Sequence, residues 1–313
     1  MATLYIDRKN TQLKTESNVL IQYVNDKRRR NIPLKYLERI VITAPVQLDT
    51  NVLLKIAEAG VQVSIINPRK IQQQALLQGS YPKNPHLRFK QYQLSNNEAA
   101  CKTIAQAIVQ TKIRKHIHFY KKLQKKRQDL HLPITKTIQQ LKQARENALK
   151  DNSLDSLRGI EGSAAKTAFA CYKHLFAESL GFTGRNRRPP KDPVNACLSL
   201  TFTLVHHRIA QQLYANGLDP MLGFLHEAKY SRDSLASDCI EIWRPDIEAW
   251  VWRLFKQQYL TSEHFSQSNE GCLLNKTGRK RFYPAFENFS KPLKRAVRWQ
   301  IRQSIKRYET LIS

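Results

Sequence analysis

The stretch from Glu98 to Gln124, EAACKTIAQAIVQTKIRKHIHFYKKLQ, decides the fold class of this chain. Its apolar residues recur three or four positions apart, which places them on or near one face of a helix. Upstream, Gly79-Ser80-Tyr81-Pro82 and Asn84-Pro85 are turn and linker signals, and the periodicity is helical beyond them. The stretch therefore predicts a long helix that opens a helical domain.

Helical patterns continue from this stretch to the end of the chain. They predict helices over 132–150, from about 154 through Glu161, 195–214, 234–242, 246–259 and 292–311. The last helix is two-faced, with apolar residues at core spacing and most of its Lys and Arg residues opposite. Its basic face is either an ordinary solvated surface or one that contacts nucleic acid.

Residues 1–80 carry a different pattern, with short runs rich in β-branched and aromatic residues. Strands are expected over 3–6, 19–24, 39–43 and 61–66. Asp49 is a typical N-cap for a helix that is closed by Gly60. We therefore predict an α+β fold, with a small β-rich N-terminal domain at 1–80, a linker at 81–95 and a larger all-α domain at 96–313.

The charge of the chain is extreme. Its 313 residues include 52 Lys and Arg against 25 Asp and Glu, a formal net charge of +27. This excess argues for a polyanionic partner, with nucleic acid as the first candidate. A ribosome-associated protein, or one that merely adheres to nucleic acid, would share it. The basic residues cluster at 27–30, 121–127, 185–191, 279–281 and 294–307.

The five cysteines are scattered without a CxxC pair, so neither a zinc site nor a disulfide framework is indicated. Unpaired cysteines fit a reducing compartment, and we expect a cytoplasmic protein. The N-terminus lacks the apolar stretch of a signal peptide, and no run approaches the roughly 18 apolar residues of a membrane span. We expect no membrane association.

The residues that could carry chemistry in this basic chain are Glu161, His226, Asp238 and Glu241. Asp238 and Glu241 are three positions apart, so on a helix they share a face and repel each other unless something neutralises them. A salt bridge to Arg232 or Arg244 would do so, and a divalent metal would do so as well. Spacing alone favours the salt bridge.

The segments around these positions resemble the Cas1 family of CRISPR-associated integrases, in family order and over nearly the whole helical half. One departure is Ser231, which stands where the family usually has a glycine before its Arg-x-Ser-Leu segment. The segments that carry the resemblance are Gly159-Ile160-Glu161-Gly162 with Ala165-Lys166, Arg185-x-Arg187-Arg188-Pro189-Pro190-x-Asp192-Pro193-Val194-Asn195, Gly223-Phe224-Leu225-His226, Arg232-x-Ser234-Leu235, Asp238-x-x-Glu241 with Arg244-Pro245, and Leu274-Asn275-x-x-Gly278-Arg279.

The resemblance implies a metal site. It makes Glu161, His226 and Glu241 the ligands and Asp238 an adjacent carboxylate, either behind the ligands or helping them. Two carboxylates and an imidazole suit Mg²⁺ or Mn²⁺ with open positions for water and phosphate, and the imidazole tilts the choice toward Mn²⁺. Basic residues beside the motifs are the candidates to hold DNA: Arg185, Arg187, Arg188, Lys229 and Arg232.

The resemblance also implies an activity: a metal-dependent DNA endonuclease and integrase that inserts short foreign DNA, the prespacer, into a CRISPR repeat array by phosphoryl transfer. The expected partners are DNA, a second copy of the chain bound mainly through the N-terminal domain, and the small protein Cas2. A monomer held together by its partner is the alternative assembly. The alternative functions are a non-catalytic DNA-binding scaffold and a structure-selective nuclease acting on branched DNA.

Overall fold

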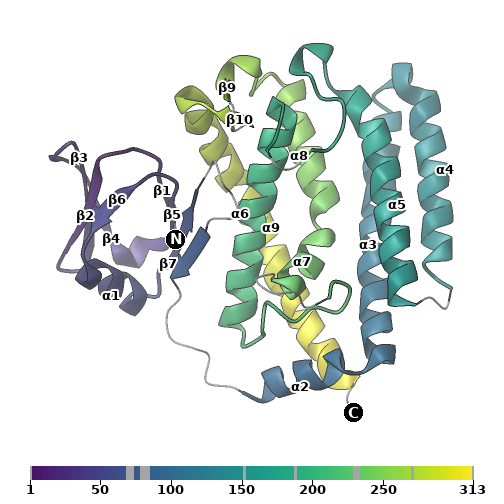
Figure 1. Ribbon diagram of the computed structural model, residues 1–313, viewed down its shortest axis with the longest axis horizontal. Coiled ribbons are helices and arrows are strands. Elements are labelled where there is room, and N and C mark those ends of the chain that lie inside the picture. The colour runs from purple at the N-terminus through teal and green to yellow at the C-terminus, as the bar shows by residue number, and fades with distance from the viewer. Residues whose placement is uncertain are drawn as a thin grey trace. The chain divides into compact units, whose positions relative to one another are not determined.

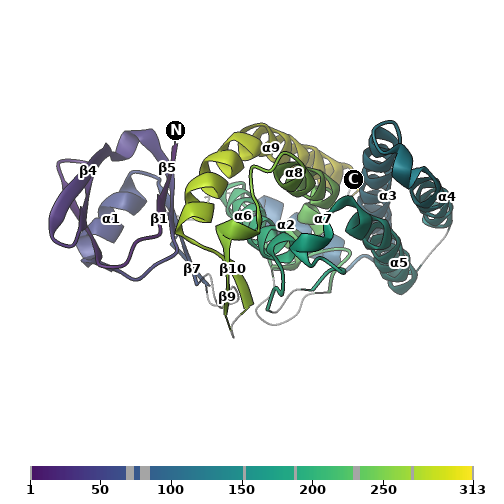
Figure 2. The same ribbon diagram turned by 90° about the horizontal axis from the view of Figure 1, so that it is seen from above.

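The computed structural model describes residues 2–67, 74–77, 85–150, 153–186, 189–227, 233–268 and 271–311 (Figures 1 and 2). The chain divides into two compact units, Met1–Tyr81 and Pro82–Ser313. The first is built mainly from strands and the second mainly from helices, so the predicted fold class is confirmed.

The N-terminal unit contains two four-stranded sheets among its described residues. One sheet has the order β1 (Ala2–Ile6), β5 (Leu37–Ile42), β7 (Gln62–Ile66) and β8 (Gln74–Leu77). The other has the order β4 (Lys27–Pro33), β3 (Val19–Val24), β2 (Thr11–Glu16) and β6 (Val46–Leu48). In the first sheet β1, β5 and β7 run parallel, and in the second β2, β3 and β4 run antiparallel.

Two tight turns set the register of the antiparallel strands. The β2–β3 turn places Ser17 and Asn18 at φ of 43° and 63°, and the β3–β4 turn places Asn25 and Asp26 at 50° and 59°. Two successive positive φ angles define the two-residue hairpin turn whose twist matches that of the strands, and Asn and Asp tolerate it best. The basic run at 27–30 therefore lies on an exposed hairpin strand.

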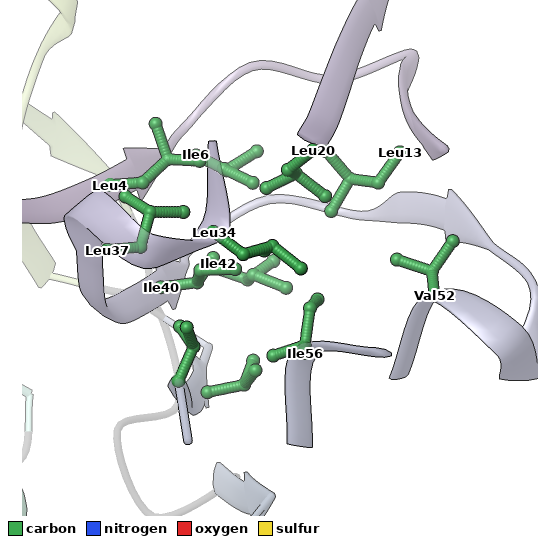
Figure 3. Close-up of a cluster of buried hydrophobic side chains, with 12 residues drawn as sticks. Leu4, Ile6, Leu13, Leu20, Leu34, Leu37, Ile40, Ile42, Val52 and Ile56 are labelled. Atoms are coloured by element: carbon green, nitrogen blue, oxygen red, sulfur yellow. The ribbon is translucent and has the colours of Figure 1, made fainter. Parts of the chain in front are cut away.

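The core of the N-terminal unit is apolar (Figure 3). Leu4, Ile6 and Ile40 come from the first sheet, Leu13 and Leu20 from the second. Helix α1 (Thr50–Glu58) adds Val52 and Ile56. As predicted, Asp49 caps this helix by accepting the backbone N–H of Val52 at 2.9 Å, and Gly60 follows its end at a φ of 69°.

The helical unit is organised around α3 (Glu98–Gln124), which matches the predicted helix residue for residue. It packs against α4 (His131–Asn147), α5 (Leu154–Tyr172) and α8 (Arg244–Lys256). The remaining long elements are α2 (His86–Ser95), α6 (Pro193–Ala215), α7 (Ser234–Glu241) and α9 (Lys276–Thr310). Side-chain oxygens of Asn97, Ser153 and Asp192 cap α3, α5 and α6.

Three features of the helical unit differ from the sequence analysis. Residues 86–95, assigned to the linker, form α2, which packs on α3 and α9. A short antiparallel hairpin of β9 (Phe265–Ser268) and β10 (Gly271–Leu274) interrupts the expected all-α domain. The last helix spans residues 276–310 instead of 292–311.

Prolines explain the error in the last helix. Pro284 and Pro292 both lie inside α9, and an internal proline normally ends a helix because it removes one hydrogen bond and clashes with a carbonyl. Both prolines are on the exposed side, so water can bind the carbonyls that they leave unpaired. Burial of Phe282, Phe286 and Val297 on the opposite side outweighs the cost.

Candidate active site

Three helices bring the candidate residues together. Helix α3 lies against both α5, which carries Glu161, and α7, which carries Asp238 and Glu241 (Figure 1). His226 stands on the loop before α7. Arg158, one turn before Glu161, donates to Glu227 Oε1 at 3.0 Å, so α5 is tied to the loop that carries His226.

A lysine joins the two glutamates. The Lys112 Nζ atom on α3 contacts Glu161 Oε1 and lies 2.5 Å from Glu241 Oε2. The other oxygen of Glu241 accepts Arg244 Nε at 2.7 Å. Lys112 is 3% exposed and Glu241 4% exposed, so the charges are removed from water and depend on one another.

The opposite charges of this cluster stabilise one another in their ionised forms. Burial raises the pKa of Glu241, but Arg244 and Lys112 outweigh burial and hold the pKa well below its ordinary value. Burial lowers the pKa of Lys112, but Glu241 and Glu161 reverse the shift and raise it above its ordinary value. Both side chains are therefore charged at neutral pH, and two carboxylates converge on one cation.

Asp238 holds the loop of His226. It is fully buried, and its Oδ2 atom accepts the backbone N–H groups of Phe224 at 2.6 Å and Leu225 at 3.0 Å. Its Oδ1 atom accepts the backbone N–H of His226 at 3.0 Å and lies 2.7 Å from His226 Nδ1. With Asp238 ionised, Nδ1 donates that bond, which leaves the Nε2 lone pair of His226 available to a metal. Metal-ligating histidines are commonly oriented by a carboxylate in this way.

Close packing and a buried amide fix the same loop. A Cβ atom on Gly223 would lie 2.8 Å from Asp238 Oδ2 and 2.8 Å from the backbone carbon of Ser234, so a larger residue does not fit. Gln91 of α2 is completely buried, donates to the carbonyls of Asp219 and Leu222 at 2.9 Å, and accepts the Asp219 N–H at 2.8 Å. The element expected to be a linker thus supports the candidate site.

The four predicted residues form two linked pairs. Glu161 and Glu241 meet through Lys112, His226 meets Asp238, and Asp238 and Glu241 share α7. Within the described ranges, no three His, Cys, Asp or Glu side chains converge closely enough to hold one ion. The chemistry of the donors nevertheless fits a divalent ion, because two carboxylates already hold one positive charge and His226, bonded through Nδ1 to Asp238, has its Nε2 nitrogen for a metal. Arg244 also makes the salt bridge that spacing alone favours.

Lys112 and Gln91 escaped the sequence analysis. Lys112 had a visible signal, because it follows Ile104 and Ile108 at four-residue intervals and so falls on the buried stripe of α3. A charged residue at such a position needs a partner. Gln91 had no comparable signal, since its bonds reach residues more than 120 positions away.

The DNA-binding candidates have mixed outcomes. Arg187, Arg188, Lys229 and Arg232 lie outside the described residues. Arg185 is described, and its guanidinium donates to Asn195 Oδ1 at 2.8 Å and Ser199 Oγ at 3.1 Å. It therefore fastens the segment before α6 to that helix, and its contact with DNA stays a prediction.

Comparison with known proteins decides the family. The family model described as CRISPR associated protein Cas1 matches residues 4–288. This chain belongs to the Cas1 family. The CRISPR-associated endonuclease Cas1 1 of Thermodesulfovibrio yellowstonii is 37% identical over 92% of this chain and 91% of its own length. Cas1 3 of Thermus thermophilus is 31% identical over 82% of this chain and 74% of its own.

Solved structures share the Cas1 fold of this chain. A Cas1 protein from Thermotoga maritima superposes with a TM-score of 0.84 at 22% identity, over 98% of this chain and 97% of its own. A casposase bound to integration product superposes with a TM-score of 0.85 at 18% identity, over 99% of this chain and 91% of its own. The described part of this Cas1 protein contains no helix that is long and apolar enough to cross a membrane.

Proposed function

We propose that this Cas1 protein is a metal-dependent DNA endonuclease and integrase that inserts short DNA into a CRISPR repeat array. Relatives at 37% and 31% identity are named CRISPR-associated endonucleases. The net charge of +27 suits a DNA partner. The observation that carries the proposal is the meeting of Glu161 and Glu241 around one cation, with Glu241 on the same helix as the buried carboxylate that orients His226.

Glu161, Glu241 and His226 would hold Mg²⁺ or Mn²⁺, with the ion replacing the Lys112 ammonium between the carboxylates. A divalent ion supplies Lewis-acid activation of the phosphate and stabilises the oxygens that attack and leave. In the reaction a DNA 3′-hydroxyl attacks a phosphorus atom, a new P–O bond forms as an old one breaks, and a proton passes from the attacking to the departing oxygen. With water as the attacking group, the same site hydrolyses DNA.

The residues of the chain prepare the site for this chemistry. Asp238 keeps the proton of His226 on Nδ1, which leaves the lone pair on Nε2. Arg244 holds one oxygen of Glu241 and keeps that carboxylate ionised. The Arg244 guanidinium also keeps a fixed positive charge at the carboxylates, and fixed charge of this kind stabilises the negative charge of a phosphoryl-transfer transition state.

The assembly belongs to the same proposal. A complex described as Cas6-RT-Cas1–Cas2 contains a chain with the fold of this one, at a TM-score of 0.84 and 23% identity, of which this protein covers 35%. A crystal structure described as a TtCas1–DNA complex matches with a TM-score of 0.52 at 14% identity. We accordingly propose DNA, Cas2 and a second copy of this chain as partners, in the cytoplasm.

A strand-transfer assay tests the function. Purified protein and its Cas2 partner are incubated with short labelled duplex DNA and a supercoiled plasmid that carries a repeat array, in Mn²⁺, Mg²⁺ or EDTA. We expect label in the plasmid with either metal and none in EDTA. Glu161→Ala should abolish transfer, and Glu146→Ala, which removes an exposed glutamate of α4, should not. Binding without transfer or cleavage would identify a scaffold, and cleavage of branched DNA without transfer would identify a nuclease.

A further inference from the structure

A buried histidine and a buried glutamate lie one helical turn beyond the two cations that bond to Glu241. On α3, His116 follows Lys112 by four residues, and on α8, Glu248 follows Arg244 by four. Residues four apart share one face of a helix. His116 Nε2 lies 2.9 Å from Glu248 Oε2, so this contact joins α3 to α8. It therefore also fixes where the two helices hold their cations.

Water has little access to this contact. His116 is 1% exposed and Glu248 is 2% exposed. Further along the same two helices, Phe119 and Trp252 pack edge to face with their ring centres 6.2 Å apart. The hydroxyl of Tyr172, itself buried, donates to the backbone carbonyl of Glu248 at 2.8 Å. Because little water is present to screen it, a charge on this pair acts strongly on its neighbours.

The hydrogen bonds assign the charge of the pair. His116 Nδ1 is buried and has no hydrogen-bond partner among the described residues. A proton on Nδ1 would be a buried N–H without an acceptor, which native structures rarely contain. The single proton of a neutral imidazole is therefore on Nε2, which donates it to Glu248 as a carboxylate. The pair thus carries one negative charge.

The negative charge of Glu248 acts on Arg244. Burial lowers the pKa of the Arg244 guanidinium, but Glu241 first, and then Glu248 and Glu161, outweigh burial and raise that pKa. Arg244 Nε donates to Glu241 Oε1 at 2.7 Å, so the same guanidinium bonds to one carboxylate and lies in the field of another. Glu248 offsets part of the positive charge of Arg244, and Glu241 keeps more of its attraction for a metal ion.

We propose that Glu248, held by His116, is a positioning residue of the metal site, which sets Arg244 and, through it, the Glu241 carboxylate that the metal binds. This inference rests on the proposed function, since it takes Glu241 as a metal ligand. The pair acts through Arg244 and does not itself bind the ion. It differs in this from Asp238, which orients His226 by a direct hydrogen bond. Its loss should weaken metal binding and leave DNA binding unchanged.

The ion pair of Lys115 and Asp246 provides a matched control. It also joins α3 to α8, with Lys115 Nζ 2.6 Å from Asp246 Oδ2. Its side chains are 26% and 46% exposed, so solvent screens their charges. Asp246→Asn removes the same charge from the same helix as Glu248→Gln does. The two variants therefore differ in whether the lost charge is buried.

Manganese affinity is measured without DNA. Each purified protein is titrated with Mn²⁺ while electron paramagnetic resonance follows the free ion, and denaturant unfolding in EDTA gives the stability. Glu248→Gln should unfold close to the wild-type midpoint, because its amide oxygen can still accept the Nε2 proton of His116. Its Kd for Mn²⁺ should rise about tenfold, as is typical when a partner of a metal ligand is changed. Asp246→Asn should change the Kd less than about twofold, as expected for an exposed ion pair.

Two changes at His116 test the hydrogen bond to Glu248. His116→Gln keeps an N–H donor for the carboxylate, and its Mn²⁺ affinity should stay close to that of the wild type. His116→Leu removes the donor, so the buried carboxylate takes up a proton and the Kd should rise as in Glu248→Gln. In strand transfer, excess Mn²⁺ should restore the rate of Glu248→Gln. The KM for DNA should not change, because this variant loses metal affinity and not DNA affinity.

Equal Mn²⁺ affinities of the wild type and Glu248→Gln would overturn the proposal, as would equal losses for Glu248→Gln and Asp246→Asn. Lower stability at unchanged affinity would also overturn it, because the pair would then only pack α3 against α8. If Glu248→Gln did not fold, equal affinities of His116→Gln and His116→Leu would overturn the proposal instead. In each case the wild type would still bind metal and transfer DNA, so the proposed function would stand. A wild-type protein that bound neither Mn²⁺ nor Mg²⁺ would overturn the proposed function and this inference with it.

Discussion

The two units of the chain bury different kinds of side chain. In the described part of the N-terminal unit, the core is aliphatic and Arg39 is the single buried charged residue. The helical unit buries both signs of charge, including Lys112, Asp192, Asp238, Glu241 and Glu248. Burying a charge costs free energy unless it is paired and hydrogen-bonded. The N-terminal unit therefore depends on apolar packing, whereas the helical unit keeps costly buried charges, three of which, Lys112, Asp238 and Glu241, lie at the candidate site.

The strongest test of this comparison is Asp238→Asn. Each oxygen of Asp238 accepts two N–H groups, so either orientation of the new amide turns its NH₂ group toward two donors. We expect the free energy of unfolding to fall by roughly 3–5 kcal/mol, as for a broken buried charge network. Strand transfer should fall at least about a hundredfold, because His226 loses its orientation. Denaturant unfolding and transfer assays measure both, with Asp26→Asn at the exposed β3–β4 turn as the control.

A variant with the same stability as the wild type would contradict this account. Asp238 would then not organise the His226 loop. The difference between the aliphatic core of the N-terminal unit and the buried charges of the helical unit would then not explain how the site is held. Loss of transfer without loss of stability would instead make Asp238 a direct metal ligand.

Lys112→Met is expected to have the next largest effect. Without the ammonium, Glu161 and Glu241 face each other with Arg244 alone to offset them. In EDTA we expect a loss of about 3 kcal/mol in the free energy of unfolding, since one partner of a buried ion network has gone. Mn²⁺ should restore stability by occupying the vacated position, so its effect on the melting temperature should exceed that in the wild type.

Lys121→Met provides the control on the same helix, at an exposed position. If Mn²⁺ raised the melting temperature of Lys112→Met and wild-type protein by the same amount, the ammonium would not stand where the metal binds. The measurement needs no catalytic turnover, so it separates metal binding from activity.

The sequence predicted some of this architecture for local reasons. The α3 stripe, the Asp49 cap and the i,i+3 pair of Asp238 and Glu241 follow from residues close in sequence, and all are present. The identity of the four site residues came from resemblance to Cas1 proteins and not from spacing. Spacing alone favoured a salt bridge from this pair to Arg232 or Arg244, and Glu241 makes the bridge to Arg244.

What the sequence could not predict depends on distant contacts. The N-terminal part of α9 was missed because it contains two prolines, which disfavour a helix. The free energy gained by burying aromatic residues against the rest of the unit outweighs the cost of these prolines. Strands β2 and β4 were missed because polar and charged residues dominate them, although their hairpin turns carry Asn and Asp. Lys112 meets its partners from 49 and 129 residues away.

A smaller effect tests the other side of the comparison. Ile40→Val removes one methylene from the fully buried core of the N-terminal unit. We expect a loss of about 1 kcal/mol in the free energy of unfolding of that unit, because a small cavity forms. Hydrogen exchange should show faster opening of β1, β5 and β7 and no change in α3, α5 and α7. Faster exchange at the site helices would mean that the two units unfold together.

The smallest expected effect comes from Gly159→Ala, and its sign is opposite. Gly159 lies inside α5, two residues before Glu161, and a Cβ atom there would meet nothing within 4 Å in the described structure. Glycine in a helix interior is less favourable than alanine, so the change should stabilise the protein by about 0.5 kcal/mol. Packing among the described residues gives no reason for glycine at this position, and close approach of DNA to the exposed face of α5 would give one. We therefore expect a slightly higher melting temperature together with weaker DNA binding and slower strand transfer.

Gly60→Ala in the N-terminal unit is the contrasting control. The φ of 69° at Gly60 makes alanine unfavourable there, so stability should fall while DNA binding should not change. If Gly159→Ala raised both stability and transfer, the glycine would serve neither the fold nor DNA binding. This exposed position of the helical unit would then not trade stability for function, in contrast to the buried charges of the same unit.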